Sequence, residues 1–208
     1  MSTEKTRIAV LVSGGGTNLQ AILDAVDSGK ITHGEVKVVI SSRADAYALE
    51  RAKNHSVDGK VVSRKNCQSQ QEFEKGITDI LDEYKIDLIV LAGFMSILSA
   101  DFTKKYENRI LNVHPSLIPS FCGKGFYGLR VHEAALSYGV KVTGATVHFV
   151  NEIPDGGEII LQKAVYIEPD DTPETLQKRV MQEAEWKILP EAVEIVSERL
   201  MKEKGEQI

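Results

Sequence analysis

Apolar residues along the chain form short continuous runs that alternate with segments of helical spacing. The runs predict buried strands over 7–13, 35–41, 60–63, 87–92 and 109–113. Between the runs, apolar side chains recur on one helical face, first at Leu19, Ile22, Leu23 and Val26. Further helices are predicted over 44–53 and after Ser69, which forms a capping-box pattern with Glu72 and precedes apolar positions at Phe73, Ile77, Ile80, Leu81 and Tyr84. Alternating apolar strands and helices are typical of a doubly wound α/β fold, with a mostly parallel sheet covered on both faces.

The pattern changes after residue 140. Segments 142–150 and 158–167 have strand character, and the connection between them is too short for a helix, so we expect an antiparallel pair. Thr172 and Pro173 then begin a final helix as its cap and first residue, and Pro190 is expected to kink or restart that helix. The inward positions predicted for it are Leu176, Val180, Ala184 and Ile188. We expect one domain over 1–208, with flexible ends at 1–6 and 201–208.

Composition narrows the class of protein. The 208 residues carry a formal net charge of −5, which argues against a protein held on nucleic acid by phosphate contacts. Cys67 and Cys122 are too few for a disulfide framework, and neither they nor His132 and His148 have metal-ligand spacing. No apolar run approaches membrane-spanning length. We therefore expect a cytoplasmic protein without a metal or a membrane contact.

A glycine-rich segment follows the first predicted strand. The sequence "SGGGTNLQ" (13–20) places three glycines where backbone N–H groups at a helix N-terminus can hold an anion, typically a phosphate. The spacing matches neither the dinucleotide fingerprint nor the P-loop. A tight turn capped by Thr17 or Asn18 is the alternative interpretation.

The strand over 109–113 ends in an unusual way. Asn112 and His114 lie two residues apart, so on an extended strand their side chains point to the same side, and Pro115 stops the strand immediately. In open parallel sheets ligands bind beyond the carboxyl ends of the strands. An amide donor beside an imidazole suits a carbonyl that becomes an oxyanion. The alternative is an amide that closes the strand end and a histidine that fills a polar corner.

The segment "IPDGG" (153–157) offers a carboxylate that could join this pair. If the loop folds toward His114, Asp155 would favour the imidazolium and raise the histidine pKa. An ordinary Asp-Gly turn is the competing explanation. Cys122 in "FCGKG" is better interpreted as a loop cysteine than as a nucleophile, so direct attack by a substrate amine fits better than a covalent enzyme intermediate.

Taken together, seven motifs make the chain resemble the phosphoribosylglycinamide formyltransferases, a family of folate-dependent enzymes of purine synthesis. These motifs span nearly the whole sequence in order: "VLVSGGGTNLQAI", "SRADAYALERA", "VLAGFMSIL", "LNVHPSLIPSF", "TGATVHFV", "DGGEIILQ" and the terminal helix. The resemblance implies transfer of a formyl group from 10-formyltetrahydrofolate to the amine of glycinamide ribonucleotide. It further implies small-molecule substrates and a monomer or homodimer.

The resemblance also implies roles for individual residues. Asn112 and His114 would stabilise the tetrahedral intermediate, and Asp155 would keep His114 charged. The residues implied in ribonucleotide binding are Gly16, Thr17, Asn18, Gln182 and Glu185. Those implied in folate binding are Gln70, Met95, Ser96, Ile97, Leu98, Asn151, Glu152, Ile153 and Pro154.

Three features depart from the family pattern. Ser96 stands where many members carry arginine, so any contact from that arginine is absent here, and Gln70 falls roughly where some members place an arginine that contacts the folate tail. The segment 121–132 is longer than in several relatives, and its glycines suggest a mobile flap. A formyltetrahydrofolate deformylase and a non-catalytic phosphate-binding module are the alternative functions. The first is disfavoured because the first strand begins near residue 7, leaving no room for an amino-terminal regulatory domain.

Overall fold

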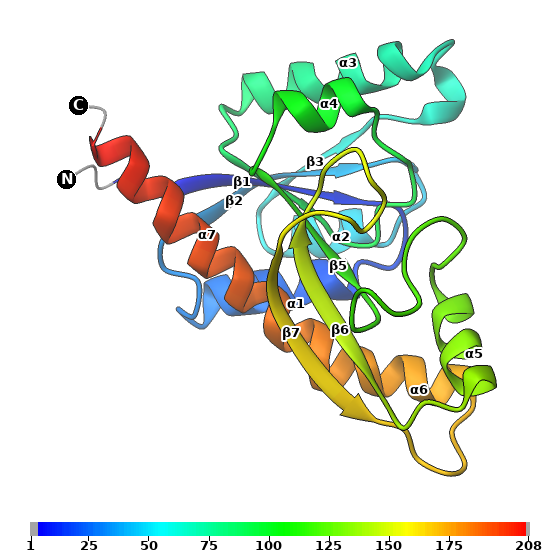
Figure 1. Cartoon of the computed structure of the whole chain (residues 1–208). Helices are drawn as coiled ribbons and strands as arrows, with labels where there is room; N and C mark the ends of the chain where they lie inside the picture. Colours follow the sequence, from blue (N-terminus) through cyan, green and yellow to red (C-terminus); the bar gives the residue numbers. More distant parts are fainter. Residues whose placement is uncertain (1–3, 207–208) are drawn as a thin grey trace.

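A computed structural model describes residues 4–206 and contains an open seven-stranded sheet (Figure 1). The strand order is β3-β2-β1-β4-β5-β6-β7. The first five strands run parallel, while β6 pairs antiparallel with both β5 and β7. The strands are β1 (Thr6–Val12), β2 (Gly34–Ser41), β3 (Asp58–Val61), β4 (Leu88–Leu91), β5 (Ile110–His114), β6 (Val142–Phe149) and β7 (Ile159–Tyr166). The predicted α/β class and the antiparallel carboxy-terminal pair are confirmed.

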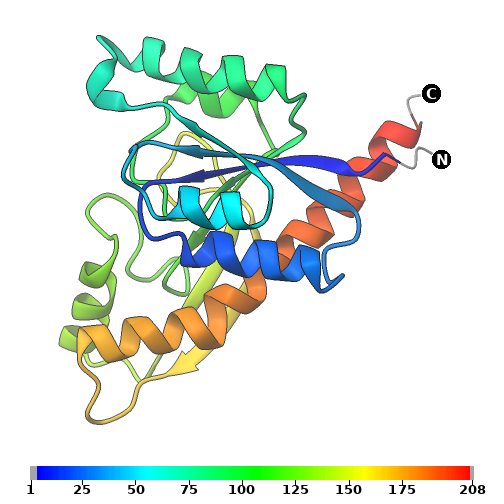
Figure 2. The same ribbon diagram turned by 180° about the vertical axis from the view of Figure 1, so that it is seen from behind.

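Helices cover both faces of the sheet (Figures 1 and 2). One face carries α3 and α4, and the other carries α1, α2 and α7. Strand β1 supplies both cores, because Ile8 and Val10 face one layer while Ala9 and Leu11 face the other, and all four are fully buried. The helices are α1 (Thr17–Asp27), α2 (Ala48–Asn54), α3 (Gln70–Glu83), α4 (Ala100–Lys105), α5 (Leu129–Tyr138), α6 (Pro173–Val180) and α7 (Trp186–Glu206), with a 3₁₀ turn η1 (Arg64–Asn66) and a π-helical turn η2 (Met181–Glu185).

The order of the strands determines where a ligand can bind. From β1 the chain moves outward through β2 to β3, then returns to place β4 on the other side of β1. The loops after β1, β4 and β5 therefore leave the same edge of the sheet around this reversal point. A crevice at this position is the usual ligand site of open α/β sheets. The glycine segment and the Asn112–His114 pair both lie at this edge.

Several predicted boundaries were wrong. Helix α2 begins at Ala48 rather than residue 44, because Ala48 N–H donates to Gly14 O in the loop after β1. Strand β3 spans Asp58–Val61 instead of 60–63. Helices α4 and α5 were not predicted, and α5 takes residues 129–132 out of the expected flap. Only residues 121–128, which we call the flap, remain a loop.

The carboxy-terminal helix follows its predicted start. Thr172 Oγ1 accepts from Thr175 N, Pro173 is the first helical residue, and the four predicted inward positions are buried. An interruption was expected at Pro190, but the π-helical turn η2 lies before it and α7 starts one turn ahead of that proline.

Of the ends predicted to be flexible, 1–6 and 201–208, the structure describes residues 4–6 and 201–206. Thr6 is a buried residue of β1, anchored because its hydroxyl donates to Ser197 O. Helix α7 continues through residues 201–206. Residues 1–3 and 207–208 lie outside the described part of the chain.

Candidate active site

Two adjacent strands place the polar side chains of the candidate site. Asn112 and His114 alternate with buried Leu111 and Val113 along β5, so their side chains share one side of the strand. In the antiparallel register with β6, Asn112 lies opposite His148 and His114 lies opposite Thr146. His114 is 4% exposed. The strand thus presents an amide and an almost fully buried imidazole at the sheet edge.

Asp155 reaches this pair from the β6–β7 connection. Its Oδ2 lies 3.5 Å from His114 Nδ1, and its Oδ1 lies 3.6 Å from His148 Nε2. The residue has a positive φ of 55°, and Gly123 N–H donates to its Oδ2 over 2.8 Å. A non-glycine residue in this conformation is held against its backbone preference by such contacts. The loop therefore folds toward His114, the arrangement on which the predicted pairing depended.

His114 is held from both sides of its ring. Its Nε2–H donates to the carbonyl of Phe121 in the flap over 2.9 Å, while Nδ1 faces Asp155. Burial lowers the pKa of His114 below its ordinary value of 6.5, although Asp155 and the Phe121 carbonyl act in the opposite direction. The sequence predicts that Asp155 raises this pKa. The carboxylate does act in that direction, but burial outweighs it.

The pKa of Asp155 is lowered. Burial acts to raise its pKa, but the hydrogen bond from His148, the charge of His114 and the Gly123 N–H together hold the pKa below its ordinary value of 3.8. The carboxylate is therefore charged across the neutral range, and its negative charge faces two imidazoles.

Replacing Asp155 with asparagine should lower the pKa of His114 further, because the carboxylate opposes the desolvation of the imidazolium. Ring-proton NMR titration of the wild type and the variant measures this directly. Asp27→Asn is the matched control, since Asp27 pairs with a different histidine, His55. An unchanged or raised His114 pKa in Asp155→Asn would contradict this electrostatic account.

His148 is a member of the cluster that sequence reasoning missed. Its Nδ1–H donates to Phe149 O over 2.8 Å, and its Nε2 lies 3.3 Å from Asn112 Nδ2 and 3.6 Å from Asp155 Oδ1. The predicted antiparallel pair was 142–150 with 158–167, whereas His148 is set opposite Asn112 by the pairing of β6 with β5, which the sequence did not indicate. His148 thus orients the Asn112 amide and also faces Asp155.

Two other groups near the cluster are less suited to chemistry. His132 on α5 is fully buried, neither of its ring nitrogens has a partner in the described chain, and burial lowers its pKa to about 4. Burial, followed by the charge of Asp155, raises the pKa of the Cys122 thiol. A thiol held in the neutral form is a poor nucleophile, which agrees with the interpretation of Cys122 as a loop cysteine.

The glycine loop lies at the same sheet edge. Gly16 precedes α1 with a φ of 71°, and no side chain caps this helix, so the first N–H groups of α1 remain available. Asn18 Nδ2 donates to Glu185 Oε2 over 2.7 Å, which joins the loop to the π-helical turn η2. Gln182 is exposed on that turn. Of the predicted ribonucleotide residues, Asn18 and Glu185 are therefore in direct contact.

The loops after β4 and β6 carry the residues predicted to bind folate. Met95 and Ile97 expose 62% and 82% of their surface, and Ile153 in the β6–β7 loop exposes 58%. Leu98 packs against the core, and Ser96 is half-buried. Glu152 and Pro154 are exposed beside Ile153, and Asn151 Oδ1 accepts from Ile153 N over 2.9 Å. These loops present apolar side chains to solvent, which suits a planar apolar ligand.

Gln70 makes a contact of its own. Its Nε2 donates to Ile97 O over 2.9 Å and to Glu74 Oε1 over 2.7 Å. Gln70 is therefore bound to the 95–98 segment, beside which it was predicted to contact the folate.

Comparison with known proteins agrees with this geometry. A family model described as formyl transferase matches residues 6–193. The chain is 46% identical to the phosphoribosylglycinamide formyltransferase of Haemophilus influenzae, over 88% of this chain and 84% of that protein. The chain belongs to the formyl transferase family.

Solved structures extend the match. Glycinamide ribonucleotide transformylase 1 from Symbiobacterium toebii superposes on this chain with a TM-score of 0.88 and 45% identity, over 95% of this chain and 90% of that one. The phosphoribosylglycinamide formyltransferase of Coxiella burnetii superposes with a TM-score of 0.85 and 41% identity, over 93% of this chain and 88% of that one. The chain also matches the trifunctional purine biosynthetic protein adenosine-3 of Gallus gallus at 42% identity over 95% of its own length, but spans only 19% of that protein.

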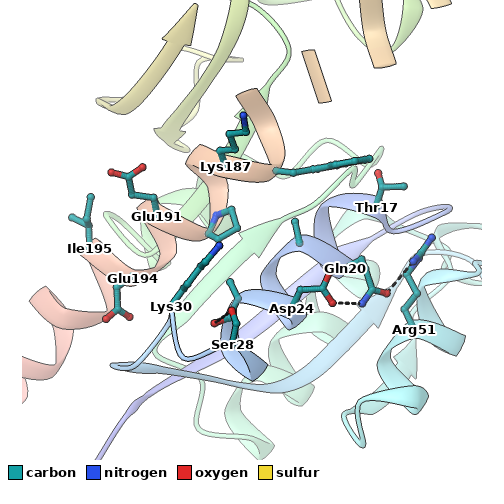
Figure 3. A pocket seen from close by; sticks show the side chains of 14 residues that line it. Thr17, Gln20, Asp24, Ser28, Lys30, Arg51, Lys187, Glu191, Glu194 and Ile195 are labelled. Carbon is teal, nitrogen blue, oxygen red and sulfur yellow. Dashed lines mark hydrogen bonds between the residues drawn. The ribbon is translucent and has the colours of Figure 1, made fainter. Parts of the chain in front are cut away.

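The protein has a further pocket of about 690 Å³ between α1 and α7 (Figure 3). Thr17 and Arg51 connect it to the glycine loop, and Lys30, Lys187 and Glu191 lie around it. None of Asn112, His114 and Asp155 lines this pocket. The His114 ring and the Asp155 carboxylate bond to the flap instead.

Within residues 4–206 we find no group of acidic, histidine or cysteine side chains arranged to hold a metal. No helix in the same range has the length and apolar character needed to cross a membrane.

Glu185 is a buried carboxyl group. It is 6% exposed, and burial raises its pKa from 4.5 to about 7, against the hydrogen bond from Asn18, which lowers it. In the unfolded chain Glu185 ionises near pH 4.5, whereas in the folded protein it stays neutral until about pH 7. The stability that Glu185 contributes is therefore fully present below pH 4.5 and is lost as the pH rises through about 7. The loss amounts to about 3 kcal/mol as an upper bound, at about 1.36 kcal/mol per pKa unit.

Glu185→Gln should therefore gain stability relative to wild type as the pH rises from about 5 to about 8, since the amide cannot ionise but can still accept from Asn18. Urea unfolding of both proteins at the two pH values tests this. Glu183→Gln, at an exposed position in the same turn, is the control. A difference between variant and wild type that does not change with pH would contradict the assignment.

Proposed function

We propose that the protein transfers the formyl group of 10-formyltetrahydrofolate to the glycinamide amine of 5-phosphoribosylglycinamide, giving N-formylglycinamide ribonucleotide and tetrahydrofolate in purine biosynthesis. The observation that carries the proposal is the convergence of Asn112, His114 and Asp155 at the sheet edge that also holds the glycine loop. Membership of the formyl transferase family, and the names of relatives that the chain covers almost fully, support the same reaction.

The cluster suits acyl transfer without a covalent enzyme intermediate. The substrate amine attacks the formyl carbon, and a new C–N bond forms while the formyl oxygen takes the negative charge. Asn112 Nδ2–H and a ring N–H of His114 can donate to this oxyanion, and Asp155 favours the charged imidazole. The carbonyl then re-forms as the bond to N10 of the folate breaks. N10 takes up a proton, and the new amide loses one to solvent.

The flap contact sets a condition on this chemistry. Phe121 O accepts the Nε2–H of His114, and Asp155 accepts from Gly123 N. For that ring N–H to donate to an oxyanion, its hydrogen bond to the Phe121 carbonyl must break. The exchange is favourable because a charged oxygen is a stronger acceptor than a neutral carbonyl. Displacing the flap would also change the burial that lowers the His114 pKa.

The two substrates would approach from different loops. The phosphate of the ribonucleotide would bind at Gly16, Thr17 and Asn18, with Glu185 on the ribose hydroxyls and Gln182 nearby. The folate would pack against the segment Met95–Leu98, with residues 151–154 closing on it and Gln70 at its tail. No metal takes part in this scheme.

A spectrophotometric assay with a 10-formyl-folate donor, run with and without glycinamide ribonucleotide, tests the proposal. Formyl loss that requires the ribonucleotide, with formylated ribonucleotide as product, is the expected result. Loss at the same rate without the ribonucleotide would make the protein a deformylase. Ribonucleotide binding with no turnover would leave only a phosphate-binding module.

A further inference from the structure

The amino end of α2 packs directly on the glycine loop. Gly16 has no side chain at the closest point, and a Cβ atom built there would lie 2.6 Å from Ala48 Cβ. Its φ of 71° also favours glycine. Since both the close approach and the backbone angle require glycine, the loop is shaped to fit α2.

Helix α2 holds two successive carbonyls of that loop. Ala48 N–H donates to Gly14 O over 3.1 Å. One helical turn later, Arg51 Nε–H donates to Gly15 O over 2.8 Å. The first contact comes from the backbone, while the second depends on the side chain of Arg51 and can be removed by mutation.

These two contacts set the direction of the N–H groups in the loop. In a trans peptide unit the C=O and the following N–H point in opposite directions. With Gly14 O and Gly15 O directed at α2, the N–H groups of Gly15 and Gly16 are directed away from it. They join the uncapped N–H groups at the start of α1 and extend that anion-binding end by two donors.

The Arg51 guanidinium is itself fixed in place. Its Nη1 donates to Gln20 Oε1 over 2.9 Å (Figure 3), and its Cζ lies 5.1 Å from the centre of the Tyr47 ring. Gln20 in turn donates to Asp24 and contacts His55 Nε2. A guanidinium held at three points can keep the Gly15–Gly16 peptide in one orientation and places a positive charge beside the loop.

We propose that Arg51 is a positioning residue for the phosphate of the ribonucleotide, acting through the Gly15–Gly16 peptide unit; this rests on the proposed function. Arg51 orients the Gly16 N–H toward the phosphate and does not contact the reacting atoms. Arg51 should therefore affect binding of the ribonucleotide and leave binding of the formyl-folate unchanged.

Kinetics separates this role from a general structural one. Arg51→Ala should raise the KM for glycinamide ribonucleotide by about tenfold, the loss expected for one hydrogen bond from a charged group. The KM for the formyl-folate and the thermal midpoint should stay near wild type. Arg51→Lys keeps the charge but lacks the fork that reaches Gly15 and Gln20 together, so it should give an intermediate KM. Lys53→Ala removes an exposed cation from the same helix and is the matched control.

A second measurement does not depend on formyl transfer. Inorganic phosphate added to ¹⁵N-labelled wild-type protein should shift the amide signals of Gly15, Gly16 and Thr17, and Arg51→Ala should weaken this titration by a similar factor. If Arg51→Ala binds phosphate as well as wild type, the positioning role is overturned. It is also overturned if Arg51→Lys has the wild-type KM for the ribonucleotide while Lys53→Ala does not. Failure of the wild type to formylate the ribonucleotide would overturn the proposed function, while the phosphate titration still decides the role of Arg51.

Discussion

Replacing His114 with alanine should lower the turnover of formyl transfer by about 10²–10³, the loss typical of removing one oxyanion donor. The imidazole is 4% exposed and lies 3.5 Å from Asp155. Its loss removes a donor that strengthens as charge develops on the formyl oxygen. We therefore expect the effect in kcat and in kcat/KM alike, with the KM values little changed.

The control for this variant is His33→Ala. His33 also pairs with a carboxylate, Glu194, but at the start of β2 and away from the candidate site. Its removal should leave turnover near wild type. His114→Ala should keep the fold, because its ring bonds only to a loop carbonyl and a loop carboxylate. Turnover within about fivefold of wild type would rule out His114 as an oxyanion donor.

The fold was predictable because its signals are local. Apolar runs and helical spacing reflect burial, and the cap at Thr172–Pro173 reflects backbone chemistry within one turn. The same reasoning found Asn112 and His114, since their positions on one strand determine their common side. Predictions of this kind depend on neighbours in sequence.

The features that sequence reasoning missed depend on contacts between distant segments. His148 joins the cluster through strand register, and the flap contact from Phe121 O could not be read from composition. The net direction of the His114 pKa depends on how burial and the Asp155 charge compare, which needs three-dimensional packing. Helix α5 was not predicted because its buried face includes His132, a polar residue that interrupts the apolar spacing from which helices were inferred.

Replacing Gly157 with alanine should damage both stability and catalysis, although the residue bears no functional group. A Cβ atom built there would lie 1.7 Å from Phe149 O, a backbone atom of β6 that cannot rotate away. In the same turn Phe149 N–H donates to Glu158 O over 2.8 Å, so the end of the β6–β7 pair must open to admit a methyl group. We expect a loss of about 1–3 kcal/mol in the free energy of unfolding, as in other overpacked sites.

The catalytic loss should exceed what this instability explains. Asp155 lies two residues before Gly157 and depends on the same loop for its positive φ and its approach to His114. A displacement of about 1 Å at such a group can cost about 10²-fold in rate. Turnover should therefore fall by about that factor in the folded fraction of the protein, and the His114 pKa should shift down as in Asp155→Asn.

Gly76→Ala provides the contrast needed to interpret this result. Gly76 lies inside α3, where a Cβ would meet a side-chain atom of Val62 at 3.1 Å, and alanine favours a helix by about 1 kcal/mol over glycine. It should fold at least as well as wild type and keep full turnover. If Gly157→Ala also keeps full turnover, the position of Asp155 does not depend on the β6–β7 turn. If Gly157→Ala loses stability but retains the wild-type His114 pKa, the loop moves without Asp155, and the carboxylate is held instead by its bond from Gly123 N.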